Sequence, residues 1–331
     1  MKQRIPVLFC IDVEPEDRKV HRHAPSDWLG VEECVEFFQN LRPRLAKATN
    51  SPVHFSWFLR MDPQIAQMHG SPDWAAIRYR SLLSQLETAG DEIGLHSHSW
   101  RWDEESHDWF ADFGDPEWVD HCIASAFDAF RSSMNRRCKS FRFGDHWMSE
   151  RGLDLLEKLG TEFDLTLEPG QAAGTLLPDE RFTGSFPDCR DMPQVPYQPS
   201  KDNFVETGSN QKRKIWLIPV SADLPESGSP QSNGHADQPY VTLNLAFSSS
   251  TFSSITDRLL RRLDRPFLVI VARSDIAIRS DQRVNLVENI EYLLAHPLVE
   301  TFQCVTPAEG IKHLRFSPLR WFKETLTKSN A

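Results

Sequence analysis

Short apolar runs alternate with segments of helical periodicity along most of this chain. The first run, residues 6–11, is apolar and β-prone and ends directly in Asp12-Val13-Glu14. Strands that alternate with helices build a largely parallel sheet or barrel, whose functional groups gather at the carboxyl ends of the strands. We therefore predict an α/β fold of this kind.

The expected elements follow from the hydrophobic periodicity and from the glycines that end helices. We expect strands at residues 6–11, 53–59, 92–95, 140–144, 163–166, 266–272 and 299–305. We expect helices at residues 31–48, 74–89, 118–134, 149–159, 251–263 and 284–296.

The alternation breaks at residues 169–239, which are rich in Pro, Gly, Ser and Asp. We interpret this segment as an irregular insertion, with residues 187–199 as an ordered cap over the site and residues 221–239 as a mobile loop. No internal repeat is evident. We predict a single domain over residues 1–331, with a basic helix or tail at residues 312–331.

Charge and composition exclude several classes of protein. The 331 residues carry a net charge of −10, from 37 basic and 47 acidic side chains, without a Lys/Arg-rich stripe, so we expect no nucleic-acid partner. No apolar run is long enough to span a bilayer, and the N-terminus does not resemble a signal peptide. The six scattered cysteines are typical of reduced thiols, which predicts a cytoplasmic protein. The basic C-terminal segment reads as a surface helix, with weak peripheral membrane contact as the alternative. The oligomeric state is unknown from the sequence.

Two histidines stand two residues apart at the end of the apolar run at residues 92–95. A strand places residues i and i+2 on one face, so His96 and His98 can project into the same pocket. Neutral imidazole is the commonest protein ligand of zinc-like ions. A histidine pair of this kind needs a carboxylate partner from elsewhere in the chain.

The acidic residues after the first strand supply such a partner. Asp12 and Glu14 also share one face of an extended chain, so one can bind a metal ion while the other handles protons. An acidic turn that only ends a strand is the alternative, and the histidines argue against it. The sequence therefore predicts a metal-dependent hydrolytic site.

Four segments of the chain match the motifs of one family in order and spacing. They are residues 12–14, 92–98, 140–147 and 163–166. In these segments the chain resembles the polysaccharide deacetylases, the NodB homology domain of carbohydrate esterase family 4. The resemblance implies a deformed (β/α) barrel in which Asp12 is the general base, Glu14 the metal-binding carboxylate and Arg142 the residue that steadies the base. Asp164 matches the fourth motif and joins this catalytic group.

The chain departs from the family pattern at two places. Trp100 stands four residues past His96, where most members carry the second histidine ligand, so the resemblance gives that role to His98. The strand at residues 266–272 runs into Arg273, where the family usually supplies the histidine that acts as general acid. By motif position His146 is the nearest replacement for that acid. We assign Arg273 to substrate binding.

The resemblance implies a hydrolase that removes an N-acyl group from an amino sugar with the help of a divalent metal ion, and zinc is the expected ion. Aromatic faces are natural platforms for sugar rings, so we expect substrate contacts from Trp100, Trp102 and Trp147, which flank the motifs. Two alternatives stay open. One is a glycan-binding pseudoenzyme, favoured by the two departures, and the other is an amide hydrolase acting on a small substrate that is not a sugar.

Overall fold

The computed structural model describes residues 4–17, 19, 21–24, 27–174, 181–208, 211–224 and 240–316. The strands of its main sheet are β1 (Ile5–Val13), β2 (Ser56–Arg60), β3 (Glu92–Ser97), β6 (Ser140–Phe143), β7 (Phe163–Asp164), β9 (Trp216–Leu217), β12 (Leu268–Arg273) and β13 (Phe302–Cys304). The helices are α1 (Gly30–Thr49), α2 (Pro63–His69), α3 (Trp74–Arg78), α4 (Arg80–Thr88), α5 (Pro116–Met134), α6 (Glu150–Leu159), α7 (Ser249–Arg262), α8 (Ser280–Ala295) and α9 (Pro307–Phe316). Three short 3₁₀ helices are η1 (Gly144–His146), η2 (Ser274–Ala277) and η3 (Val299–Thr301).

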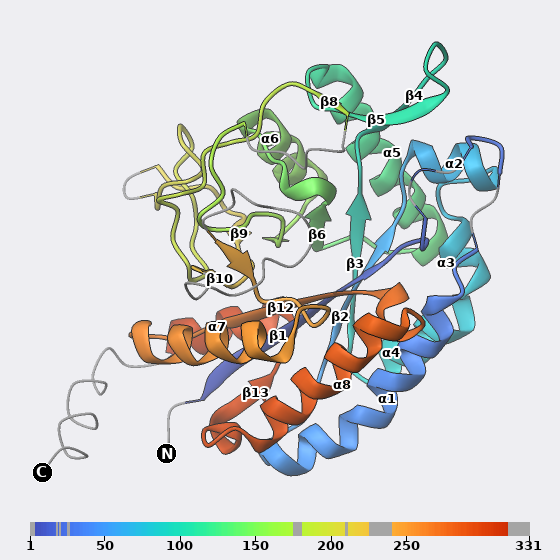
Figure 1. Ribbon diagram of the computed structural model, residues 1–331. Helices are drawn as coiled ribbons and strands as arrows, with labels where there is room; N and C mark the ends of the chain where they lie inside the picture. Colours follow the sequence, from blue (N-terminus) through green and yellow to red (C-terminus); the bar gives the residue numbers. More distant parts are fainter. Residues whose placement is uncertain are drawn as a thin grey trace, which may run out of the picture.

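All neighbouring strands of the main sheet are parallel. Their order is β12-β1-β2-β3-β6-β7-β9, and β13 pairs with the beginning of β1. The sheet is curled and helices surround it (Figure 1). The prediction of an α/β fold of the deformed (β/α) barrel type is confirmed.

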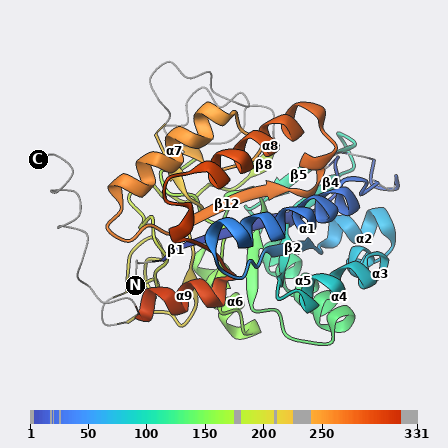
Figure 2. The same ribbon diagram turned by 90° about the horizontal axis from the view of Figure 1, so that it is seen from below.

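Apolar residues on both faces of the sheet form the core. All nine residues of β1 are buried, as is usual for a parallel strand that is covered on both sides. The buried stripe of α1 packs onto the sheet, where Phe38 contacts the edges of the Phe9 and Phe55 rings. In Figure 2, α7 and α8 lie side by side along β12. This packing holds the strand ends in a fixed register.

Several elements differ from the expected ones. The helix expected at residues 74–89 is split at Tyr79 into α3 and α4, and α2 was not expected. An unexpected antiparallel hairpin follows β3, made of β4 (Trp100–Asp103) and β5 (Asp108–Asp112). The strand expected at residues 299–305 begins as η3 and continues as β13.

The insertion at residues 169–239 contributes short strands instead of a separate unit. One of them, β8 (Phe182–Thr183), pairs with β5, β9 joins the main sheet, and β10 (Ala222–Asp223) pairs with β11 (Val241–Thr242). Most of the loop expected at residues 221–239 and most of the basic tail expected at residues 312–331 lie outside the described residues.

Two further observations concern membrane-spanning helices and disulfide bonds. In the described part of the chain, no helix combines the length and the apolar character that crossing a bilayer requires. All six cysteines are described, and each is a buried thiol without a disulfide partner.

Candidate active site

The proposed site residues lie at the carboxyl ends of neighbouring strands. In the register of the sheet, Asp12 on β1 is opposite Arg273 on β12. His96 on β3 lies between Arg60 on β2 and Arg142 on β6. Side chains that are far apart in the sequence therefore meet at one edge of the barrel, which is where α/β folds place their chemistry.

Three of these residues form a cluster with the spacing of a metal site. The ligand atoms of Glu14, His96 and His98 lie within 4.8 Å of one another. The two Nε2 atoms are 2.9 Å apart, and Glu14 Oε2 lies 3.5 Å from His98 Nε2 and 4.0 Å from His96 Nε2. All three side chains are buried. The structure thus brings together the residues that the sequence proposed as metal ligands.

The imidazole of His96 is held with its Nε2 toward this cluster. Its Nδ1 lies 3.0 Å from the backbone carbonyl of Arg142, which makes Nδ1 the protonated nitrogen and leaves the Nε2 lone pair available. Burial lowers the pKa of His96 to about 4. His96 is therefore neutral at pH 7, the state in which imidazole binds a metal ion.

His98 is oriented by a carboxylate that the sequence did not single out. Asp145 Oδ2 lies 2.9 Å from His98 Nδ1 and accepts a hydrogen bond of 3.0 Å from Trp100 Nε1. Burial favours the neutral imidazole, but the charge of Asp145 and the hydrogen bonds to Asp145 and Glu14 together raise the pKa of His98. A carboxylate behind a histidine in this way fixes the ring and its tautomer, as is common for metal-binding histidines.

The turn that carries Asp145 is adapted to this contact. Asp145 and His146 both have positive φ, at 57° and 55°. A Cβ atom on Gly144 would lie 2.2 Å from the His98 ring, so only glycine fits there. The turn after β6 therefore supports the ligand that follows β3.

Two arginines contact the carboxylate of Glu14. Arg60 Nη1 lies 3.2 Å from Oε2, and Arg273 Nε lies 2.7 Å from Oε1. Burial opposes the charge of Glu14, but Arg273 and the two imidazoles hold its pKa well below the usual value. Arg60 is fully buried and also pairs with Asp62 at 2.8 Å, which in turn accepts a hydrogen bond from the backbone N–H of His98. Glu14 is thus a fixed, ionised carboxylate.

Asp12, the proposed base, is paired with Arg142. Arg142 Nε lies 3.0 Å and 3.1 Å from the two carboxylate oxygens, and its Nη1 donates to the carbonyl of Leu165. Asp12 Oδ1 lies 3.9 Å from His96 Nδ1, so it borders the cluster without joining it. Such charge-assisted hydrogen bonds set the direction of the carboxylate.

Asp164 is buried, and its carboxyl is close enough to Arg142 to feel its charge. Its two oxygens accept hydrogen bonds from the backbone and hydroxyl of Thr166, at 3.1 and 2.7 Å. Burial raises the pKa of Asp164 to about 7, against the opposing effect of these bonds. Thr166 also accepts a bond from the backbone N–H of Phe143, so Asp164 ties β7 to β6. Its geometry is that of a supporting group.

The remaining proposed residues differ in accessibility. His146 is partly exposed, and its Nδ1 lies 2.9 Å from Glu168 Oε1. Trp100 and Trp147 are buried, and the indole N–H of Trp147 donates to the Ser185 carbonyl. Trp102 is partly exposed on the hairpin, which makes it the most accessible of the three tryptophans proposed for substrate binding.

Neither a protein-family model nor a curated protein matches the chain. Among solved structures, it is similar over 95% of its length to a protein from Parabacteroides distasonis assigned as a glycoside hydrolase/deacetylase, with a TM-score of 0.56, 14% identity and 72% of that chain covered. The chain shares the fold of this glycoside hydrolase/deacetylase. Lower scores are found for a protein from Mycobacterium smegmatis assigned as a polysaccharide deacetylase (TM-score 0.48, 13% identity, 95% of this chain and 91% of that one). A family 4 carbohydrate esterase from Streptomyces lividans in complex with acetate has a TM-score of 0.40 and 10% identity, over 92% of this chain and 94% of that one.

Three residues of the site were not expected from the sequence. Arg60, Asp62 and Asp145 all contact the Glu14–His96–His98 cluster or its supports. Each lies within three residues of the end of an expected strand, and that position was the available signal. Their contacts depend on which strands are neighbours in space, which the sequence pattern alone does not specify.

Proposed function

We propose that this protein is a metal-dependent hydrolase that removes an N-acyl group, such as acetyl, from an amino sugar or a related carbohydrate. The observation that supports this most is the buried Glu14–His96–His98 cluster at the strand ends, with Asp12 beside it. Two nitrogen donors and one carboxylate leave further coordination positions open, which is typical of hydrolytic zinc sites.

The distances within the cluster fit a zinc-like ion. Zinc–nitrogen bonds of about 2.0–2.1 Å in tetrahedral geometry separate two ligand atoms by about 3.3 Å. The three separations here, 2.9, 3.5 and 4.0 Å, lie on both sides of that value. Glu14, His96 and His98 are therefore the residues that would hold the ion, and zinc is the metal that we propose.

When bound, the ion would supply Lewis acidity toward the acyl oxygen and toward water. The chain's own residues perform the proton transfers. Asp12, directed by Arg142, takes the proton of the water that attacks the acyl carbon. The C–N bond then breaks, and the leaving nitrogen receives a proton from His146 or from Asp12, which returns the one it took. Arg273 pairs with Glu14, and its partly exposed guanidinium can also contact the substrate.

Acetate release tests this proposal. The purified protein, supplied with zinc, should release acetate from N-acetylated amino sugars, and a chelator should stop the release. A metal-loaded protein that releases no acetate from sugars but hydrolyses small linear or cyclic amides would instead support the non-sugar amide hydrolase. We also keep a cytoplasmic location as a prediction.

One observation favours the pseudoenzyme as a second candidate. Arg60 and Arg273 already place two positive charges on the single carboxylate that would face the ion. A site in which arginine takes the place of the metal would bind a glycan without turnover. Metal content of the purified protein separates the two candidates.

A further inference from the structure

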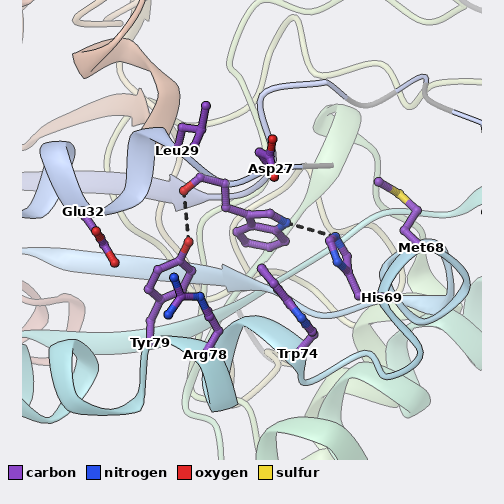
Figure 3. A pocket seen from close by; sticks show the side chains of 9 residues that line it. Asp27, Leu29, Glu32, Met68, His69, Trp74, Arg78 and Tyr79 are labelled. Atoms are coloured by element: carbon purple, nitrogen blue, oxygen red, sulfur yellow. Dashed lines mark hydrogen bonds between the residues drawn. The ribbon is translucent and has the colours of Figure 1, made fainter. Parts of the chain in front are cut away.

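A pocket of about 450 Å³ lies apart from the Glu14–His96–His98 cluster, where α1 begins and α2 ends (Figure 3). Its walls combine aromatic rings with charged groups, and its volume is in the range of small-molecule sites. We call it the Trp28–Trp74 pocket; it is lined by Asp27, Trp28, Leu29, Glu32, Met68, His69, Trp74, Arg78 and Tyr79.

The aromatic residues of this pocket are held in fixed positions. Trp74 stacks on His69, with ring centroids 4.2 Å apart and planes inclined by 22°, and the Trp28 ring centroid lies 5.6 Å from that of Trp74. The indole N–H of Trp28 donates to His69, and the hydroxyl of Tyr79 donates to the carbonyl of Trp28. Trp28 and Tyr79 are buried, while Trp74 and His69 stay partly exposed. A rigid aromatic wall with an open side suits a ring-shaped ligand with a hydrophobic face.

The charges of the pocket favour a cation. Asp27 and Glu32 are exposed carboxylates, and among the described lining residues Arg78, which lies over the Tyr79 ring, carries the one guanidinium. Burial lowers the pKa of His69 against the opposing charge of Asp27, so this imidazole is neutral at pH 7. The described residues of the lining thus include two carboxylates and one guanidinium, and aromatic faces beside carboxylates attract organic cations.

A hydrogen bond and helix α2 connect the segments that line the pocket with those that carry the candidate active site. Glu16, two residues beyond Glu14, accepts a hydrogen bond of 2.7 Å from the backbone N–H of Gly30, which directly follows pocket residue Leu29. Asp62, beside the cluster, precedes α2, and His69, in the pocket, is its last residue. These two residues are seven positions apart, which at 1.5 Å per residue is about 10 Å along the helix axis. A short oligosaccharide covers such a distance.

We propose that the Trp28–Trp74 pocket binds an amino-sugar unit whose nitrogen is a free ammonium, within the same oligosaccharide whose acylated unit lies at the cluster. This inference rests on the proposed function. Hydrolysis breaks the C–N bond, gives the water oxygen to the acyl group and leaves the nitrogen as an amine, which is protonated at pH 7. The ammonium would pair with Glu32 or Asp27 while the ring packs on Trp74. The enzyme would therefore prefer chains that are already partly deacylated.

Calorimetric titration of the full chain with the glucosamine dimer and with its di-N-acetylated form tests the proposal. We expect the free-amine dimer to bind more tightly, and Glu32→Gln to weaken its binding about fivefold, as loss of one partly exposed ionic contact would. Glu33→Gln is the matched control, because Glu33 lies in the same first turn of α1 but does not line the pocket. Its affinity for the free-amine dimer should stay within about twofold of the unmodified protein.

Equal weakening by Glu32→Gln and Glu33→Gln, or equal affinity for the two dimers, would overturn the proposal. Trp74→Ala provides a second variant, which should weaken binding of the free-amine dimer. The free-amine dimer has no acyl group to hydrolyse, so an inactive protein that still binds it through Glu32 would refute only the proposed function. An active deacetylase whose affinity for the free-amine dimer does not depend on Glu32 would refute only the proposed role of the pocket.

Discussion

The two carboxylates that follow β1 have different surroundings, and this difference predicts different mutant behaviour. Asp12 is paired with Arg142 and lies outside the ligand cluster, whereas Glu14 lies within it. Asp12→Asn should retain the metal and lower kcat/KM by about 10²–10⁴-fold, the usual contribution of a general base. Paired metal analysis and acetate-release kinetics check this, and an Asp12→Asn protein with unchanged kcat/KM would show that Asp12 is not the base.

Asp145 is expected to act through His98. Asp145→Asn removes the charge behind Nδ1 and should weaken metal binding by about 10–100-fold, as found for other carboxylates that support histidine ligands. A competition titration with a zinc-binding dye measures the affinity directly. Asp128→Asn, on the exposed face of α5, is a matched control that should bind metal normally. Equal affinities in the two variants would remove Asp145 from this role.

At the level of residues, the sequence identified the members of the cluster but not their supports. His96 and His98 were recognisable because spacing along a strand fixes which residues share a face, whereas the choice of Glu14 over Asp12 as the ligand came from the family resemblance. The role of Trp100 could not be predicted from strand spacing, because its indole N–H contacts Asp145, which lies in the turn after a different strand. Asp145 itself has a positive φ, and no residue pattern in this segment predicts that conformation.

The turn between β6 and α6 is the element on which the geometry of His98 depends most. Gly144→Ala would place a Cβ atom 2.2 Å from the His98 ring, so the imidazole must move. We expect this variant to lose metal and to be destabilised by about 1–3 kcal/mol, the typical cost of overpacking. Metal analysis and urea unfolding measure the two effects.

Gly152→Ala is the control for this prediction. Gly152 lies in α6, and an added Cβ would approach neighbouring atoms no closer than 3.3 Å. Alanine is the better helix former, but the Met148 and Ser149 side chains must shift by a few tenths of an ångström, so stability should change by less than about 1 kcal/mol, with metal binding unchanged. If both alanine variants keep the metal, the turn does not control His98.

At the level of elements, the parallel strands were predictable and their connections were not. A strand made of a continuous apolar run, such as residues 6–11, is stable only when both of its faces are buried. Such a run is therefore predicted to be a central strand. The β4–β5 hairpin and the break at Tyr79 are set by tertiary contacts instead. The Tyr79 hydroxyl bonds to the Trp28 carbonyl, and β5 is completed by β8 from the distant insertion.

At the scale of the whole molecule, Asp164 should make folding stability depend on pH. Its folded pKa, about 7, is above the ordinary value of 3.8 for an aspartate side chain, so the protonated form is favoured in the folded state. The contribution of Asp164 to the free energy of unfolding is fully present below pH 4 and is lost as pH rises through 7. The loss is on the order of 4 kcal/mol.

Urea unfolding at pH 5 and pH 8 tests this dependence by comparison with Asp164→Asn, because other groups also titrate. The unmodified protein should lose more stability than the variant over this interval, since asparagine stays neutral. A variant with the same loss as the unmodified protein would mean that Asp164 is ionised throughout.

The central claim is that Glu14, His96 and His98 hold one divalent ion at the strand ends of this barrel. Elemental analysis of the purified protein beside His96→Ala and His98→Ala tests it most directly. We predict about one equivalent of zinc or another divalent ion in the unmodified protein and loss of that ion in both variants. Full metal content in His98→Ala would contradict the proposed ligand set, and a protein without metal even after reconstitution would favour the pseudoenzyme.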